Sequence, residues 1–418
     1  MNQKIDFTTV SSRILNVFIL VLVCSCSGLF DGTDVRNRAI ASQKMNIEQR
    51  IHHYSLDSST VLFKVNTSNL LYARTSKNNG FFAQLLLEIK VIDIHSGDQI
   101  FLDSTLYTDN EQSNDANLLF GQVNIPLKSN TNFELRCRYT DINRNQEEIF
   151  KSRIIKTEKT VGNSTLLLLP NGLPLISRVN EGVGNYSFET NSTEEVNIYR
   201  YSQPFNLPAP PSERGRNTID NIVFEKVASS KFLTLNDDNS GLYKIGNSNN
   251  LSEHFTFLHR PKGFPVPNDY YELNLATNYF QSAEELQALL ANENQREAFE
   301  KFWIEKCGSK EKAKNTMQSY YDRMELANLH FTSYTDGWKT DRGMVFMIMG
   351  PPTRVFNQGD SEIWVYGRDN NVNNLNFAFE KIYSDKIGIY YQLQRHNGYR
   401  QVWSIAVNTW RAGRVFRF

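Results

Sequence analysis

One stretch of sequence decides how the C-terminal part of the chain folds: Gly337-Trp338-Lys339-Thr340-Asp341-Arg342-Gly343-Met344-Val345-Phe346-Met347-Ile348-Met349-Gly350-Pro351-Pro352. Its run from Met344 to Met349 is apolar on both faces, so we expect a strand at the centre of a sheet that is covered on both sides. The two prolines cannot donate hydrogen bonds to a ladder, and they predict an abrupt end to this strand.

The five residues before this run predict a tight turn that leads from a helix into the strand. Gly337 can adopt a positive φ or allow close packing, and Trp338 can bury a large surface. Thr340 and Asp341 have short side chains that can bond nearby backbone N–H groups. We therefore expect the turn to be held together by its own side chains.

Helices are predicted on the N-terminal side of this turn. Ser282-Ala283-Glu284-Glu285 is a capping-box pattern that begins a helix, and Gly308 suits the end of a second one. A third is expected from about 309 to 329, where apolar residues recur at helical spacing. Beyond Pro352 the pattern predicts strands over 362–366, 375–379 and 387–393 and a helix after Gly398.

These motifs together resemble the GWxTD domain-containing family of bacterial lipoproteins. The resemblance covers about 265–418, and it implies no biochemical activity that can be carried over. Structural or interaction roles are expected for its motif residues. The resemblance is carried by Tyr320-Tyr321-Asp322-Arg323, Ala327-Asn328, the motif residues Gly337, Trp338, Thr340, Asp341, Gly350, Pro351 and Pro352, and Glu362 to Tyr366 with Trp364.

Strand patterns fill the chain between the N-terminal region and residue 264. Alternating or apolar runs such as 82–92 and 132–139 are separated by turn residues, which favours antiparallel sandwiches. We therefore predict a multidomain, predominantly β chain with a helix-rich mixed α/β module at its C-terminus. Its expected parts are a lipoprotein signal peptide (1–25), a tether (26–55), a β-sandwich domain (56–158), a second sandwich-like domain (159–264) and the GWxTD domain (265–418).

The first residues have the pattern of a lipoprotein leader. Lys4 and Arg13 precede the apolar run 14–23, which is shorter than the roughly 20 residues that a membrane-spanning helix needs. Val23-Cys24-Ser25-Cys26 resembles a lipobox, and the small Ser25 favours Cys26 over Cys24 as the lipid-attachment residue, with ordinary signal-peptidase cleavage as the alternative. Acyl chains on Cys26 would anchor the chain in membrane lipid. Ser27, which follows Cys26, is typical of lipoproteins that are sorted to the outer membrane. The sequence does not indicate whether the chain would lie on the periplasmic or the outer face of that membrane.

The composition argues against several kinds of partner. Lysines plus arginines number 45 and acids number 45, so no net charge would hold the chain on nucleic acid. Cys137 and Cys307 are single and far apart, and we expect two buried thiols and no metal site there. The pair His52-His53 has no third ligand nearby in the sequence. Neither G-x-G-x-x-G nor G-K-[ST] occurs, so no nucleotide cofactor is expected.

No sequence pattern of an enzyme is present. Neither H-E-x-x-H nor G-x-S-x-G occurs, and the best constellation is Asp341 with His330 and Arg342, for which a turn-stapling Asp and an exposed His are the alternative. We predict a membrane-anchored envelope lipoprotein, non-enzymatic, with an envelope protein as partner, accessory to outer-membrane secretion or assembly. A surface glycan-binding lipoprotein is the alternative, because Tyr and Trp on loops can stack on sugars. A hydrolase that uses the Asp341 region is a further one.

Overall fold

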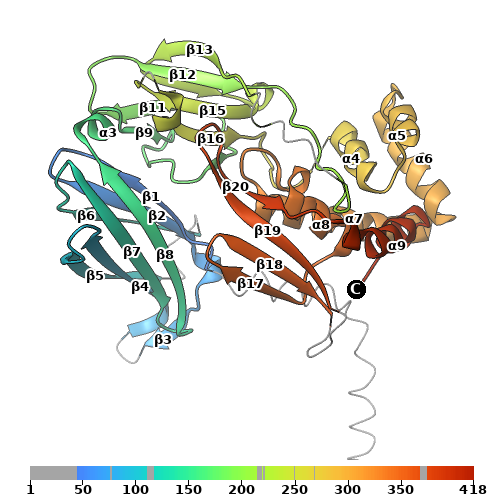
Figure 1. Ribbon diagram of the computed structural model, residues 1–418, viewed down its shortest axis with the longest axis horizontal. Helices are drawn as coiled ribbons and strands as arrows, with labels where there is room; N and C mark the ends of the chain where they lie inside the picture. The colour runs from blue at the N-terminus through green and yellow to red at the C-terminus, as the bar shows by residue number, and fades with distance from the viewer. Residues whose placement is uncertain are drawn as a thin grey trace, which may run out of the picture. The chain divides into compact units, whose positions relative to one another are not determined.

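The computed structural model describes residues 45–418 except 76–77, 111–116, 214–218, 220–221, 249, 268 and 368–373 (Figure 1). The predicted signal peptide, Cys26 and the tether up to residue 44 lie outside the described residues. The described chain is mostly β, with several sheets, and its helices gather in the C-terminal region. No helix among the described residues is long and apolar enough to cross a membrane.

The first β-region consists of two antiparallel sheets. Residues of both sheets, such as Phe63 and Leu87, are fully buried in one core cluster, as the period-two alternation predicts. The first sheet begins at Glu48, inside the segment that was expected to be a tether. One sheet has the order β1 (Glu48–His52), β2 (Ser59–Asn66), β6 (Leu118–Ile125), and the other has the order β3 (Ala73–Thr75), β4 (Asn78–Asp93), β7 (Thr131–Asp141), β8 (Gln146–Lys156), with β5 (Gln99–Asn110) also paired to β4.

The second β-region begins with the short helix α3 (Glu158–Gly162), which Thr157 caps. Its core cluster also takes side chains from two sheets, for example Leu167 from one and Ile245 from the other. Among the described strands of this region, β10 and β16 are the one pair that runs parallel. One sheet has the order β14 (Phe232–Leu235), β11 (Gly184–Thr190), β9 (Thr165–Leu168), and the other has the order β10 (Val179–Asn180), β16 (Phe255–His259), β15 (Gly241–Gly246), β12 (Val196–Tyr201), β13 (Glu225–Ser230).

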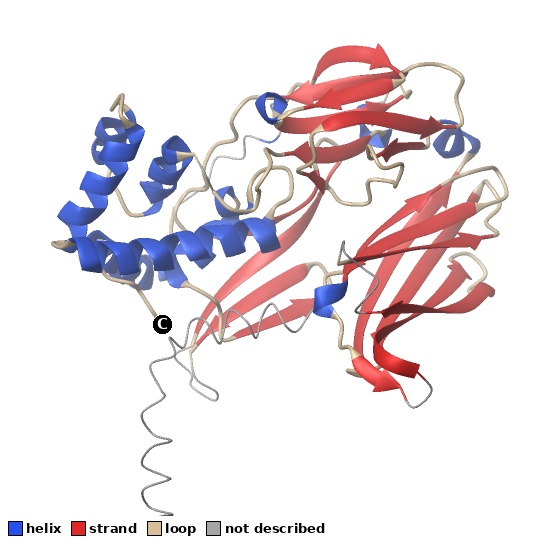
Figure 2. Ribbon diagram, turned by 180° about the vertical axis from the view of Figure 1, so that it is seen from behind, coloured by secondary structure: helices blue, strands red, loops and turns tan. Residues whose placement is uncertain are grey.

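The C-terminal region packs helices beside one antiparallel sheet, as Figure 2 shows in blue and red. Ser282 and Glu285 form the predicted capping box, and Gly308 ends a helix in the left-handed conformation. The elements are α4 (Tyr270–Ala276), α5 (Ala283–Leu290), α6 (Gln295–Cys307), α7 (Lys310–Phe331), α8 (Asp341–Met349), α9 (Arg400–Arg411) and the sheet β17 (Arg354–Gln358), β18 (Ser361–Tyr366), β19 (Leu375–Ser384), β20 (Gly388–Leu393), in this order.

The prediction of a central strand over Met344 to Met349 is wrong, because these residues belong to the helix α8. The helix is buried on all sides, and a short run that is apolar on both faces has no periodicity with which to separate a buried strand from a buried helix. The motif therefore joins helix to helix, and Gly350-Pro351-Pro352 ends a helix instead of a strand. The sheet that was expected to hold this run is formed by β17 to β20.

Candidate functional site

Gly337 is present because the turn packs directly against a helix. It opens the short 3-10 helix Gly337–Lys339 after α7, and a Cβ atom at this position would lie 1.8 Å from the carbonyl oxygen of Ala327. Its φ is not positive, so close packing is the relevant one of the two predicted roles. Thr332 accepts a hydrogen bond from the Gly337 N–H at 2.9 Å. A larger residue would push the turn away from α7.

Trp338 fills the space between this turn and the surrounding helices. Its side chain is fully buried, and the ring of Tyr279 meets it edge-on at 6.1 Å. Tyr279 also donates its hydroxyl to the Trp338 carbonyl at 2.7 Å, and the Trp338 N–H reaches the Asn328 side chain at 3.3 Å. Both motif residues therefore fix the turn by packing and by backbone bonds, as was predicted for a stapled turn.

Thr340 is the N-cap of α8. Its hydroxyl donates to the Gly337 carbonyl at 2.7 Å and accepts from the Gly343 N–H at 3.1 Å. A Cβ atom on Gly343 would lie 1.9 Å from that same carbonyl oxygen, so only glycine fits at this place in the first turn of the helix. The prediction that Thr340 bonds a nearby backbone N–H is confirmed.

Asp341 acts over a longer distance than was predicted. Its carboxylate accepts the N–H of Leu393, in β20, at 2.7 Å, and it forms an ion pair with the guanidinium of Arg395. Arg395 in turn donates to the carbonyl of Ala209 at 3.1 Å. Asp341 thus fastens the end of β20 to the start of α8, and it links both to the segment before Pro210.

The remaining motif residues close the other end of α8. Gly350 has a φ of 83°, and the guanidinium of Arg323 lies against it, so that a Cβ atom there would be 2.9 Å from Nη2. Its carbonyl accepts the Tyr366 hydroxyl at 2.7 Å. Pro351 and Pro352 are buried directly after it. Trp364, on β18, is 2% exposed and donates its indole N–H to Glu362.

Arg323 contributes to this site although its role could not be derived from its position in the sequence. Its guanidinium donates to the carbonyls of Met347 and Ile348 at 3.0 and 3.2 Å, which are at the C-terminal end of α8, and to Phe416 at 2.7 Å. A cation at this end of a helix is favoured by the helix dipole. Arg323 lies on the buried stripe between Tyr320 and Ala327, but its residue type alone suggests a surface position.

A buried charge cluster next to the motif was also missed. Asp336 forms ion pairs with Arg260 and with Lys339, and Lys339 bonds Glu272 at 2.7 Å. Burial alone would raise the pKa of Asp336, but Arg260 and Lys339 outweigh it and lower this pKa. Burial and the Asp336 charge raise the pKa of Glu272. In the sequence, these residues look like ordinary surface charges.

Asp341, His330 and Arg342, the three residues considered as a possible catalytic group, each contact different residues of the protein. The carboxylate of Asp341 is bonded to Leu393 and Arg395, as described above. The guanidinium of Arg342 lies 3.4 Å from Glu362 and 3.8 Å above the ring of Tyr391. His330, at the end of α7, packs beside Phe331. The polar contacts of Asp341 and Arg342 are with other residues of the C-terminal region and hold the fold together.

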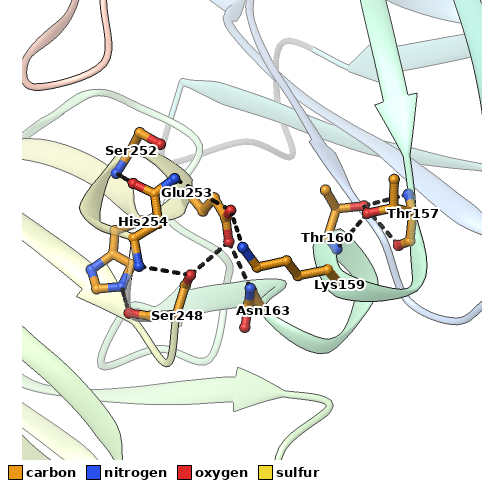
Figure 3. A network of polar contacts seen from close by, with 9 residues as sticks. Thr157, Lys159, Thr160, Asn163, Ser248, Ser252, Glu253 and His254 are labelled. Carbon is orange, nitrogen blue, oxygen red and sulfur yellow. Dashed lines mark hydrogen bonds and ion pairs between the residues drawn. The ribbon is translucent and has the colours of Figure 1, made fainter.

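Figure 3 shows a second polar cluster, which joins α3 to the turn before β16. Glu253 accepts hydrogen bonds from Lys159 at 2.8 Å, Asn163 at 2.8 Å and Ser248 at 2.6 Å. His254 bonds the Ser248 carbonyl through Nε2 at 2.8 Å. His52 and His53 lie near α3, where His52 bonds the Ser164 hydroxyl at 2.8 Å. Among the described residues, no group of three potential ligands could hold a metal.

Beside this cluster lies a cavity of about 380 Å³. It is lined by Arg50 of β1, by Arg178, by His254 and the following residues, and by the turn between β19 and β20. Lys244 of β15 bonds the carbonyl of Asp385 in that turn at 2.9 Å, so the C-terminal sheet and the second β-region meet here (Figure 1). The side chains that line the cavity come from segments far apart in the sequence, and no motif connects them.

The fold and the motif geometry define a mostly β chain whose C-terminal helices and sheet are organised around a buried Gly-Trp-x-Thr-Asp turn. Residues 241–412 match the model of the GWxTD domain, so the chain contains a GWxTD domain. The match begins at β15, earlier than the boundary at 265 expected from the sequence. No curated protein matches the chain.

Proposed function

We propose that this chain is an envelope lipoprotein, anchored in the outer membrane through acylated Cys26, that serves as a non-enzymatic structural or protein-interaction module. Its two β-rich regions would be sandwich-like modules between the anchor and the GWxTD domain, and its partner would be an envelope protein that belongs to a secretion or assembly machine. The lipobox-like Val23-Cys24-Ser25-Cys26 supports the anchor.

The observation that carries the non-enzymatic role is how the motif side chains are bonded. Trp338 is fully buried, Thr340 caps α8, and Asp341 holds Leu393 and Arg395. A catalytic carboxylate would need to reach a substrate, and these groups are instead bonded to the protein itself. The motif therefore supports a scaffold, and function would lie on the surfaces that this scaffold presents.

The surface that best suits a protein partner is the edge of the C-terminal sheet that β17 forms. Among the described strands, β17 pairs with β18 alone, and all five of its residues are exposed. Val355 and Phe356 are 41% and 44% exposed on this strand. An edge strand offers unpaired backbone groups that can accept another strand. At the opposite edge, Asp341 already bonds the N–H of Leu393 on β20.

Glycan binding receives less support from the exposed aromatic residues. All five tryptophans of the chain are buried, at 0 to 6% exposure, so none can stack on a sugar. The strongly exposed tyrosines among the described residues are Tyr54, Tyr271 and Tyr383, and they belong to three separate segments of the chain.

The proposal is tested in cells that make the full-length chain. A photo-crosslinking residue at Phe356 should capture a specific envelope protein, and the same residue at exposed Leu329 on α7 should not. Cys26→Ala should move the chain out of the membrane fraction. An unchanged membrane fraction would refute the anchor, and equal capture at both positions, or none at Phe356, would refute the edge-strand interface.

A further inference from the structure

The cavity between β1, β16 and the β19–β20 turn contains more positive than negative charge. Arg50 and Arg178 line it, and Asp385 is the one acidic side chain among its lining residues. Lys244 lies close by, 1% exposed, and bonds the carbonyls of Leu251 at 2.7 Å and Asp385 at 2.9 Å. Within the part of the chain that the structure describes, none of these three cations forms an ion pair with a carboxylate, although the charge of Asp385 acts on Lys244.

The two arginines are held in different ways. Arg50 donates to the carbonyls of Thr165 at 2.6 Å and Leu175 at 3.2 Å, and its guanidinium lies 3.5 Å over the ring of Phe255. Burial lowers the pKa of Arg50 to about 9, whereas Arg178 is an exposed residue that lines the cavity. The guanidinium of Arg178 has no hydrogen-bond partner among the described residues and lies beside Gly388, where a Cβ atom would be 3.3 Å from Nη1. Arg178 therefore retains its full capacity to donate.

A buried acceptor without a partner lines the same cavity. His254 is 6% exposed, and its Nε2 is bonded to the Ser248 carbonyl, so the neutral ring presents Nδ1 as an acceptor. Nδ1 has no partner in the described part of the chain. A buried polar atom of this kind costs free energy unless a ligand or water satisfies it.

The other walls of the cavity are apolar. Ile51, Ile176, Leu242, Phe257 and Ile389 line it. Small-molecule sites are concave and mostly apolar, with few polar groups that fix the ligand, and their volumes start at about 300 Å³. The cavity of about 380 Å³ falls within that class.

We propose that this cavity binds a small organic anion that has an apolar body, a carboxylate or phosphate group held by Arg178 and Arg50, and a hydroxyl or N–H group that donates to Nδ1 of His254. Guanidinium groups suit both anions because they offer paired donors. The described residues that line this cavity include none of β17, and the proposal does not involve Cys26, so it can be tested separately from the lipid anchor and the β17 interface.

Fluorine NMR titrations of the purified full-length chain test this proposal. The probes are para-fluorophenylacetate, para-fluorobenzylphosphonate, and the neutral para-fluorophenylethanol, with detergent alone as the blank. The acid or the phosphonate should bind about ten-fold or more tightly than the alcohol. The neutral alcohol cannot form the charge-assisted hydrogen bond with the arginines that the two anions form. The stronger of the two anions identifies a carboxylate or a phosphate as the natural group.

Variants separate the two recognition elements. Arg178→Met should weaken anion binding about ten-fold or more, whereas Arg153→Met, which removes an exposed arginine on β8, should not change it. Replacing phenylacetate by para-fluoromandelate adds a hydroxyl and should strengthen binding several-fold in the unmodified chain. His254→Gln keeps a donor for the Ser248 carbonyl but removes Nδ1, so it should abolish this gain.

The proposal is overturned if none of the probes binds, if acid and alcohol bind equally, or if Arg178→Met and Arg153→Met behave alike. If mandelate keeps its advantage in His254→Gln, the role of His254 is refuted. Unchanged thermal unfolding of Arg178→Met would show that its lost binding does not come from unfolding.

Discussion

At the scale of residues, the motif consists of side chains that bond the protein's own backbone. Asp341 was identified from the sequence as a turn-stapling acid, and it does have a structural role, but its partners lie more than fifty residues away, at Leu393 and Arg395. Residue type and spacing predicted that the side chain would accept N–H bonds. They could not predict which strand would be brought to it, because that depends on the packing of the sheet against α8.

Asp341→Asn should destabilise the GWxTD domain by roughly 3 kcal/mol or more. The change leaves Arg395 inside the protein without its counter-charge, and both side chains are only 10 to 12% exposed. Chemical denaturation followed by tryptophan fluorescence measures the loss. The double variant Asp341→Asn with Arg395→Met should lose less than the sum of the two single variants. Full additivity would contradict a direct pair.

The lowered pKa values of His52 and His53 predict how the free energy of unfolding depends on pH. Burial, followed by the charge of Arg50, lowers the pKa of His52 from 6.5 to about 4, and burial lowers that of His53 to about 4. Between pH 6.5 and 4 the unfolded chain binds protons that the folded chain excludes. Stability is therefore complete above pH 6.5 and is lost as the pH falls toward 4.

His52→Gln should reduce this loss by about 1–2 kcal/mol at pH 5, because a neutral side chain takes up no proton in either state. Urea midpoints at pH 7.5 and pH 5 measure it, with His95→Gln on the exposed turn after β4 as the control. If both variants lose stability on acidification as much as the unmodified chain does, burial of His52 is not the cause.

At the scale of elements, the sequence predicted those whose ends carry a chemical signal. The capping box at Ser282, the glycine at 308 and the alternation of β4 and β7 each have a local physical cause, and each is where it was expected. The segment 344–349 has no alternation of apolar and polar residues. It is buried on all sides, and a segment in such a place is apolar whether it is a helix or a strand. The missed signal was Thr340, which is a favoured N-cap residue for a helix.

Thr340→Ala should therefore destabilise the domain by about 1 kcal/mol through loss of the N-cap. Thr340→Ser keeps a hydroxyl that can accept the Gly343 N–H and should retain most of the stability. Denaturation midpoints of the two variants make the comparison. Equal losses would show that the methyl group of Thr340, and not its hydroxyl, is what matters.

At the scale of the whole molecule, the expected division into separate domains did not anticipate how closely the regions are joined. Leu62, Leu166 and Ile176 form one cluster between the two β-regions, and Leu242, Leu258 and Ile387 belong to another between the second region and the C-terminal sheet. The match to the GWxTD domain begins at β15, within a five-stranded sheet. Such contacts join segments far apart in the chain, and no local pattern encodes them.

Buried cations that donate to carbonyl groups strengthen these joins. Arg50 of β1 bonds Thr165 and Leu175, while Lys244 of β15 bonds Asp385. A bond of this kind has a directed geometry, which apolar contact lacks, so it fixes one region against the next. The regions should then unfold together, although each has its own core.

Arg50→Met tests this coupling. It removes both carbonyl bonds between β1 and the second β-region at a cost of roughly 1–3 kcal/mol, while the apolar side chain can still cover Phe255. Differential scanning calorimetry should show one transition for the unmodified chain and for Arg153→Met, and a broadened or split transition for Arg50→Met, because the first β-region no longer gains stability from its neighbour. A single transition of unchanged width in Arg50→Met would mean that the apolar cluster around Leu62 couples the regions without the arginine.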